Sequence, residues 1–468
     1  MTIDSVDPAT GETVACYDEM RPAETAAAVD AAHRAFLDWR HTPFAERTAC
    51  LRRAAELLRA RRDDHAALMA REMGKPVRQG RAEADKCAWV CEHYAEHADA
   101  MLADRHVETE ARRSYVTFQP LGVILAVMPW NFPFWQVFRF AAPNLVAGNG
   151  AVLKHASNVF GCALAIEEVL REAGFPGDLF RSLLIGSKQV DAVIEHPKVA
   201  AVTLTGSTAA GAAVAAKAGS VIKKTVLELG GSDPYLVLED ADLEHAAETC
   251  VDWRLINSGQ SCIAAKRFLV VDTVYDDFER LFVERMAMKR MGDPSDESND
   301  LGPQARWDLR DDLHEQVRRS VEAGARLLLG GEVPDGPGAY YPPTVLAGVE
   351  PGMAAFDEEV FGPVAALVRV AGEEEAVELA NRSVYGLGAA VFTRDHARGE
   401  RVARRLAAGC CFVGAGVKSD PRLPFGGIRD SGYGRELGEL GIRELVNAKT
   451  VWVEEGGRRD GDRREAVE

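Results

Sequence analysis

The first hundred residues carry apolar side chains at the spacing of amphipathic helices. In the stretch 26–40, Val29, Phe36 and Trp39 fall on one helical face together with Ala32. A second helix is expected around the apolar positions 51, 54, 55 and 58. A third helical stretch ends near the sequence MGKP (73–76), because glycine and proline stop helices. The chain therefore begins with a helical segment.

From about residue 121, short apolar runs alternate with alanine-rich helical stretches. The runs span 121–128, 150–154, 182–186, 199–206 and 223–231. Strands separated by helices build parallel sheets whose two faces are both covered. Because crossovers between parallel strands are right-handed, this pattern predicts a doubly wound, Rossmann-like sheet that binds its ligand at the carboxyl ends of the strands.

A second β/α series follows and predicts a second α/β domain. Its apolar runs span 234–240, 267–272, 326–331 and 362–370, and the series continues to about residue 430. Two further strands, 113–119 and 449–455, lie apart from both series. Strands of this kind often pair outside their own domain, so they predict a small β element at a subunit interface.

These patterns divide the chain into four parts. Residues 1–105 and 121–232 are expected to form the first domain, and 233–440 the second. Residues 106–120 and 441–455 are expected to supply oligomerisation strands in a homodimer or homotetramer. The polar segment 456–468 predicts a disordered tail.

Charge and composition narrow the class of protein. The net charge of −17 and the lack of a large basic face argue against a nucleic-acid partner. No apolar run reaches the ~18 residues of a membrane span, and the N-terminus lacks the features of a signal peptide. The nine cysteines are odd in number and scattered, which favours a reducing cytoplasm over a disulfide framework.

One cysteine lies in a stretch that invites a chemical interpretation. Cys262 stands in INSGQSCIAAKR (256–267), between a Gly-Gln-Ser turn and a short basic run. A thiolate is a strong nucleophile, but an unpaired cysteine is more often a small buried apolar residue. The stretch alone leaves both interpretations open.

Two polar residues stand where predicted strands end. Glu228 closes an apolar strand just before Gly230 and Gly231, where partial burial would raise its pKa and make it a better general base. Asn131, in MPWNFP, presents an amide where an oxyanion donor is useful. Each also has a structural interpretation, as a turn cap for Glu228 and a helix cap for Asn131.

A weaker signal points to a phosphate-bearing ligand. Gly206 and Gly211 follow a predicted strand and open a helix, whose N-terminus favours phosphate. Lys154 is a cation at the end of another strand, where it could meet a ribose or phosphate, although by itself it is typical of a surface lysine.

A metal site is not expected. Cys87 and Cys91 form one i,i+4 pair, and His93 and His97 form another. The two pairs lie on different faces of a helix, so they cannot converge on one ion.

Taken together, the motifs resemble those of the NAD(P)-dependent aldehyde dehydrogenase superfamily. The resemblance covers about residues 5–455 and rests on PWNFP, LELGG and GQSC, with Glu228 and Cys262 34 residues apart. DPATGE (7–12), EEVFGPV (358–364) and PFGGIRDSGYGREL (424–437) add to it. LKHASN, AGAAVAAKAG, GGSDPYLVL and AAKRF are similar to the short bacterial succinate-semialdehyde dehydrogenases.

The resemblance implies a fold and a set of catalytic roles. The first domain would bind the cofactor and the second would be catalytic. Cys262 would attack an aldehyde, most simply succinate semialdehyde, and Asn131 would hold the oxyanion. Glu228 would activate the water that hydrolyses the thioester, and Glu436 would assist proton transfer.

The resemblance also assigns cofactor contacts. The family's NAD or NADP contacts match Trp130, Lys154, Gly206, Ser207, Glu359 and Phe361. Many NAD-preferring members carry a glutamate where this chain has Ser157. A small neutral side chain there removes repulsion against a 2′-phosphate, so NADP is expected to be accepted.

Substrate choice rests on fewer residues. Arg139 lies eight residues after Asn131, and eight helical residues span ~12 Å, so its guanidinium could hold the far carboxylate. Ser419 matches a family serine that helps in this. Where some relatives carry a second arginine, six residues before the nucleophile, this chain has Ile256, and Arg254 is the nearest substitute.

Four alternative interpretations compete with this one. An acyl-CoA-forming enzyme would lack the catalytic glutamate, whereas Glu228 is present. A dehydrogenase for another aldehyde, such as glutarate semialdehyde, stays open. A catalytically silent binding protein on the same fold is disfavoured by the intact Cys262, Glu228 and Asn131. A papain-like hydrolase is disfavoured because no histidine stands out as the partner of the cysteine.

Overall fold

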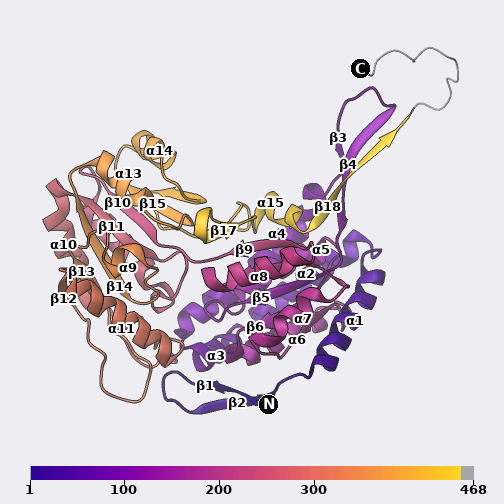
Figure 1. Ribbon diagram of the computed structural model, residues 1–468, viewed down its shortest axis with the longest axis horizontal. Helices are drawn as coiled ribbons and strands as arrows, with labels where there is room; N and C mark the ends of the chain where they lie inside the picture. Colours follow the sequence, from indigo (N-terminus) through magenta and orange to yellow (C-terminus); the bar gives the residue numbers. More distant parts are fainter. Residues whose placement is uncertain (1, 455–468) are drawn as a thin grey trace.

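The computed structural model describes residues 2–454 and contains two α/β units and a projecting β arm (Figure 1). The helices expected within the first hundred residues are confirmed from Pro22 onward. They are α1 (Pro22–Trp39), α2 (Phe44–Ala60), α3 (Arg62–Met73) and α4 (Val77–Met101). Gly74 ends α3 in the left-handed region at φ 76°, as the MGKP signal predicts. An N-terminal hairpin, β1 (Thr2–Val6) with β2 (Thr13–Asp18), was not predicted.

The first unit is built on a six-stranded sheet in the order β17-β9-β8-β5-β6-β7. Five of its strands are parallel, which confirms the doubly wound prediction: β5 (Val123–Met128), β6 (Gly150–His155), β7 (Phe180–Ser182), β8 (Val199–Thr205) and β9 (Lys224–Glu228). Its helices after the N-terminal segment are α5 (Trp135–Val146), α6 (Phe160–Glu172), α7 (Val190–Glu195) and α8 (Thr208–Ser220).

Two details of this sheet differ from the prediction. The strand expected at 182–186 is instead Phe180–Ser182, because only these three residues find partners on β6. The sixth strand, β17 (Gly432–Tyr433), comes from far along the chain and pairs antiparallel with β9. The second domain, expected at 233–440, therefore gives one short strand to the first sheet.

The order of the strands places the ligand site. From β5 the chain proceeds through β6 and β7 on one side, and through β8 and β9 on the other. The carboxyl ends of β5 and β8 therefore form the topological switch point, where doubly wound sheets bind ligands. Residues 129–131 follow β5, and residues 206–207 follow β8.

The second unit contains a seven-stranded sheet in the order β12-β13-β14-β11-β10-β15-β16. Its strands are β10 (Asp233–Val237), β11 (Ala265–Val271), β12 (Arg326–Leu329), β13 (Thr344–Ala347), β14 (Val364–Val370), β15 (Gly388–Phe392) and β16 (Cys410–Val413). Only the edge strand β12 runs antiparallel to its neighbour. Its helices are α9 (Leu243–Leu255), α10 (Asp272–Ala287), α11 (Trp307–Glu322), α12 (Ala354–Asp357), α13 (Glu373–Asn381) and α14 (His396–Ala403).

Both faces of this second sheet are buried. Along β10, Leu236 packs into one hydrophobic cluster, whereas its neighbours Tyr235 and Val237 pack into another. A strand with two buried faces has no polar side, and this explains the continuous apolar runs in the sequence.

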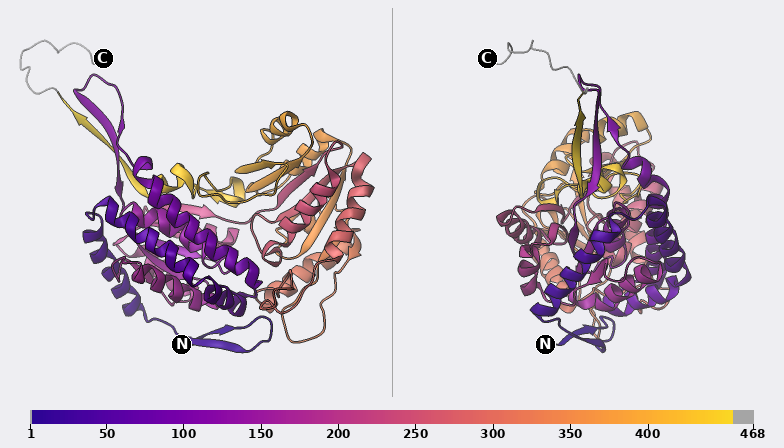
Figure 2. Two further views of the ribbon diagram at one scale, coloured as in Figure 1. Left: turned by 180° about the vertical axis from the view of Figure 1, so that it is seen from behind. Right: turned by 90° about the vertical axis from the view of Figure 1, so that its right-hand side faces the viewer.

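The two strands set apart in the sequence pair with each other. β18 (Val446–Val453) lies antiparallel to β4 (Arg113–Pro120) over its whole length, and β3 (Arg105–His106) adds a short third strand. The arm projects from the body (Figures 1 and 2). Residues 441–444 were expected to be extended but belong to α15 (Gly438–Glu444). Residue 455 and the predicted tail 456–468 lie outside the described residues. Among residues 2–454, no helix is long and apolar enough to cross a membrane.

Candidate active site

Cys262 is partly exposed in a cavity of about 250 Å³ at the switch point of the first sheet. The second unit contributes Cys262, and the first unit contributes Asn131 and Gly206 from the ends of β5 and β8. Other lining residues are Pro129, Trp130, Gln136, Thr205, Ser207, Leu229, Gly230, Leu309, Glu359 and Phe361. The cavity thus joins the proposed nucleophile to the site where the sheet is expected to bind its ligand.

A strained turn delivers Cys262 to this cavity. Asn257 and Ser258 adopt left-handed backbone conformations at φ 53° and 55°, which cost non-glycine residues about 1–2 kcal/mol each. Gly259 follows at φ 77°, and a Cβ there would collide with the carbonyl of Gly362. Such strain persists only where surrounding contacts fix the backbone.

Those contacts come from both units. The Asn257 amide donates to the carbonyl oxygens of Asn131, at 2.7 Å, and Gln260, at 3.1 Å. Gln79 Oε1 accepts the Asn257 N–H at 2.6 Å. On the other side of the cysteine, Lys266 Nζ donates to the Cys262 carbonyl at 2.8 Å. The turn is therefore hydrogen-bonded to the segment of the oxyanion candidate before Cys262 and to Lys266 after it.

Asn131 is positioned to serve as a donor. Its Nδ2 donates one hydrogen to the Gln260 carbonyl at 3.2 Å, which leaves the second hydrogen available in the cavity. The side chain is buried, so a hydrogen bond from it to a developing oxyanion would be little weakened by water.

The surroundings of the Cys262 thiol favour its protonated form. Burial raises its pKa to about 12, and this effect outweighs the opposing charges of Arg139 and Lys266. Nucleophilic attack therefore requires the thiol to lose its proton as ligands enter the cavity.

Glu228 is buried at the end of β9 and belongs to a charged cluster. Burial raises its pKa well above the usual value, the nearby guanidinium of Arg139 opposes this, and the carboxyl group of Glu436 adds to it. Arg139 forms a buried ion pair with Glu436 and donates to Thr205 Oγ1 at 3.2 Å. One guanidinium therefore serves two buried carboxyl groups, which together hold a proton more readily than either alone.

The three predicted substrate residues lie in different places. Arg139 is buried against Glu436 and lines neither the Cys262 cavity nor the cavity of about 420 Å³ next to Phe132. Arg254 is fully buried, and its Nη2 donates to the Gly259 carbonyl at 2.8 Å. It therefore supports the turn before Cys262. Ser419 accepts a hydrogen bond from Trp135 Nε1 at 3.1 Å. That these residues bind a substrate carboxylate stays a prediction.

Most predicted cofactor residues gather around the Cys262 cavity. The Trp130 and Phe361 rings meet edge to face, with centroids 5.8 Å apart. Glu359 accepts the Gly231 N–H at 2.9 Å and lies 3.7 Å from Lys266 Nζ. Lys154 and Ser157 lie apart from the cavity lining, at the end of β6 and in the short helix that follows it.

These residues fit a dinucleotide. Gly206 and Ser207 precede α8, whose first backbone N–H groups can meet phosphate, and Ser207 caps this helix by accepting the Ala210 N–H at 3.3 Å. Lys154 Nζ has no hydrogen-bond or ion-pair partner among residues 2–454. Its burial lowers the pKa of the ammonium group. The structure therefore contains the residues expected to hold a nicotinamide, a ribose and a diphosphate.

Several supporting residues were not predicted from the sequence. Gln79 and Lys266 hold the backbone on either side of Cys262, yet each resembles an ordinary surface residue in the sequence. Among these supporting residues, only Glu83 could have been singled out from the sequence, because it places a carboxylate within the apolar stripe of α4. It accepts the N–H groups of Phe134 and Trp135 at 2.8 and 2.9 Å and so fixes the start of α5.

The two cysteines and two histidines considered as metal ligands make contacts of other kinds. Cys87 and Cys91 are buried in the core of the first unit, and the rings of His93 and His97 lie 4.8 Å apart. No cluster of histidine, cysteine, aspartate and glutamate suited to a metal ion occurs within residues 2–454.

Comparison with known proteins identifies the family. The model of the aldehyde dehydrogenase family matches residues 1–451. The chain belongs to the aldehyde dehydrogenase family. It is 51% identical, over 97% of its length and 100% of the relative's, to a protein of Synechocystis named probable succinate-semialdehyde dehydrogenase [NADP(+)]. It is 50% identical to succinate-semialdehyde dehydrogenase [NADP(+)] 1 of Mycobacterium tuberculosis, covering 97% and 100% of the two chains.

Solved structures of aldehyde dehydrogenases agree with this fold. The succinic semialdehyde dehydrogenase of Streptococcus pyogenes, in complex with NADP+, superposes with a TM-score of 0.95. It is 39% identical over 97% of this chain and 100% of that chain. Family membership confirms the predicted fold and the prediction of an NAD(P)-dependent oxidoreductase.

Replacing Gly259 by alanine tests the turn. The added Cβ would collide with the Gly362 backbone, and φ 77° would strain any side chain. We expect Gly259→Ala to lower the free energy of unfolding by about 2 kcal/mol or more and to reduce turnover sharply. Gly219→Ala is the matched control, because its Cβ meets nothing within 4 Å. Denaturant unfolding curves that move equally for both variants would contradict this account.

Replacing Arg139 by glutamine tests the shared guanidinium. The cation lowers the pKa of Glu228 and of Glu436, so its loss should raise both. The ionised base would then exist only at higher pH, and the acid limb of the pH–kcat profile should move to higher pH by about one unit or more. Arg139→Lys, which keeps the charge, should move it less. If the acid limb of the pH–kcat profile stays at the same pH in Arg139→Gln, Arg139 does not lower the pKa of the general base.

Proposed function

We propose that this aldehyde dehydrogenase oxidises succinate semialdehyde to succinate, with NAD or NADP as the electron acceptor. The observation that carries the proposal is the cavity at the switch point, where Cys262, Asn131 and the dinucleotide residues meet. The substrate follows from the names of relatives about 50% identical over nearly the whole chain.

Each step has a residue suited to it. The deprotonated sulfur of Cys262 attacks the aldehyde carbon, and Asn131 Nδ2 and the Cys262 N–H hold the resulting oxyanion. The nicotinamide cofactor, when bound, supplies the acceptor for the hydride that leaves the thiohemiacetal as it becomes a thioester. Glu228, once ionised, takes a proton from the water that hydrolyses the thioester, and succinate leaves as the Cys262 thiolate is released.

In this proposal, Glu436 assists the removal of the proton that Glu228 takes from water. The charge of Glu436 raises the pKa of Glu228, and Arg139 lowers the pKa of both carboxyl groups. This electrostatic coupling supports a role for Glu436 in proton transfer.

We also propose that the protein acts in the cytoplasm as a homo-oligomer. All nine cysteines are free, which suits a reducing compartment. β18 is an edge strand of the arm, and Trp452 on it is 43% exposed. An exposed edge strand with an apolar side chain is suited to pairing with a second copy of the chain.

Steady-state kinetics of the purified protein test the substrate. Succinate semialdehyde, glutarate semialdehyde and butanal should each be measured with NAD and with NADP. We expect the highest kcat/KM with succinate semialdehyde and no detectable turnover by Cys262→Ala. A higher kcat/KM with glutarate semialdehyde would reassign the substrate, and failure of the wild-type protein to reduce either cofactor with all three would overturn the proposal.

Ser157→Glu tests cofactor choice. A carboxylate at this position would repel a 2′-phosphate but could accept a hydrogen bond from a 2′-hydroxyl, so kcat/KM for NADP should fall at least tenfold relative to NAD. Ser157→Gln is the neutral control of similar size. An unchanged NADP/NAD ratio in the glutamate variant would place the 2′-phosphate away from Ser157.

A further inference from the structure

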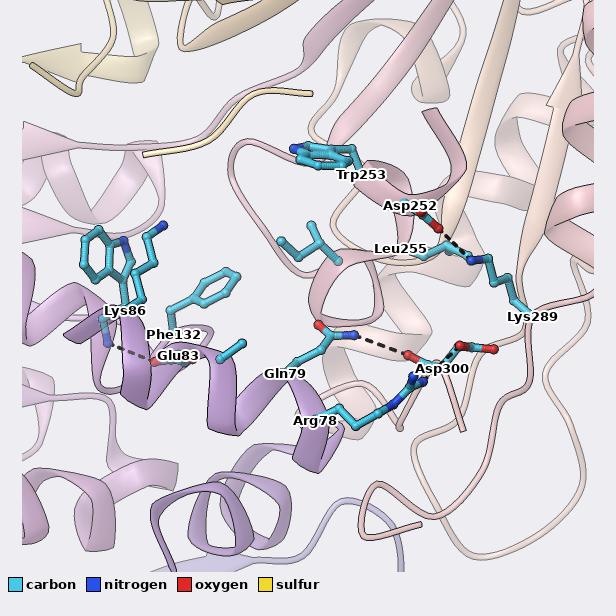
Figure 3. Close-up of a pocket in the computed structure, with 13 residues that line it drawn as sticks. Arg78, Gln79, Glu83, Lys86, Phe132, Asp252, Trp253, Leu255, Lys289 and Asp300 are labelled. Carbon is cyan, nitrogen blue, oxygen red and sulfur yellow. Dashed lines mark hydrogen bonds and ion pairs between the residues drawn. The ribbon is translucent and has the colours of Figure 1, made fainter. Parts of the chain in front are cut away.

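A second cavity, of about 420 Å³, is lined by Phe132, which follows Asn131 in the chain (Figure 3). Trp130 and Asn131 line the Cys262 cavity instead. Ile256, at the start of the turn that leads to Cys262, also lines the second cavity. The second cavity therefore adjoins the segments that carry Asn131 and Cys262. Its apolar lining consists of Ala82, Phe132, Trp135, Trp253, Leu255 and Ile256.

The charged lining residues are paired with one exception. Arg78 lies 3.1 Å from Asp300, and Lys289 lies 2.6 Å from Asp252 across the cavity from α4 (Figure 3). Glu83 pairs with the buried Lys75. Lys86 takes part in none of the ion pairs found within residues 2–454. It is therefore the one lining cation without a carboxylate in that part of the chain.

The ammonium group of Lys86 is held in place by uncharged groups. Its Nζ donates to Ser419 Oγ at 2.8 Å and lies 4.2 Å from the centre of the Trp135 ring. The side chain is only partly exposed. Burial lowers its pKa to about 8, and the charge of Arg139 acts in the same direction. A cation in this setting is stabilised by any anion that enters the cavity.

The carboxyl groups near Lys86 are already occupied. Glu83 and Asp420 both favour its charged form, as does the Cys87 thiol. Glu83, however, is paired with Lys75, and Asp420 lies 2.6 Å from Arg422. No protein carboxylate of the described chain is therefore left to neutralise the ammonium group.

Ser419 is oriented as a donor by the same contacts. Its oxygen accepts one hydrogen bond from Lys86 and a second, at 3.1 Å, from Trp135 Nε1. A hydroxyl oxygen has two acceptor positions, and both are filled. Ser419 does not itself line the cavity, but its hydroxyl hydrogen is left free to donate to a further acceptor beside Lys86.

We propose that Lys86, together with the Ser419 hydroxyl, binds the carboxylate of a short ω-carboxylated aldehyde in this second cavity. The inference rests on the proposed function and adds Lys86 as the cation that selects the substrate. The apolar walls suit the methylene groups, and the aldehyde end would extend past Phe132 toward Cys262. Arg139 is less suited to this role because its guanidinium already pairs with Glu436.

The test compares a carboxylated and an uncharged aldehyde in Lys86→Met. Methionine keeps the apolar stem over Trp135 and removes the charge. We expect kcat/KM for succinate semialdehyde to fall roughly ten- to hundredfold, chiefly through KM, while kcat/KM for butanal changes less than threefold. Lys86→Arg should recover most of the loss, and Ser419→Ala should show a smaller loss with the same preference.

Lys289→Met is the matched control, since that lysine faces the same cavity but is already paired with Asp252. It should leave the preference for succinate semialdehyde over butanal unchanged. Equal losses for both aldehydes in Lys86→Met, or no loss for either, would overturn the role of Lys86. A wild-type protein that oxidises butanal but not succinate semialdehyde would instead overturn the proposed function.

Discussion

The strained turn before Cys262 is the constraint on which the rest of the site depends. Two left-handed residues, Asn257 and Ser258, and a glycine packed against the 362–363 backbone place the cysteine between the two α/β units. Hydrogen bonds from Asn257 to Asn131 and from Lys266 to Cys262 anchor the turn to both. Cys262 and Asn131, the proposed nucleophile and oxyanion donor, come from different units, so their relative position is only as precise as this link.

The distribution of buried charge follows from the same geometry. Several cations lie near the proposed reaction centre, and each contacts a different set of groups. Lys266 donates to the Cys262 carbonyl, and Arg139 pairs with Glu436 and opposes the rise in the pKa of Glu228. Lys86 has no carboxylate partner in the described chain. Because an uncompensated buried charge is costly, an anionic substrate would stabilise the site on binding, and this couples substrate choice to the charge balance of the protein.

Much of this could be predicted from the sequence, since the relevant signals are local. The run at 123–128 is apolar throughout because both of its faces are buried, and Cys262, Asn131 and Glu228 stand in distinctive motifs. Other features depend on contacts between distant residues. Lys86 lies 333 residues from Ser419, so its isolation from carboxylates cannot be seen along the chain. The ion pair that removes Arg139 from the Cys262 cavity and the cavity next to Phe132 likewise joins residues far apart.

The central claim is that Cys262 forms a thioester whose hydrolysis depends on Glu228. Glu228→Gln keeps the shape of the side chain but cannot accept a proton from water. Incubation of this variant with succinate semialdehyde and NADP, followed by acid quench and peptide mass spectrometry, tests the claim most directly. The account predicts a succinyl group on the peptide that contains Cys262, together with a burst of NADPH equal to the enzyme present. A burst-free variant with an unmodified Cys262 peptide would contradict it.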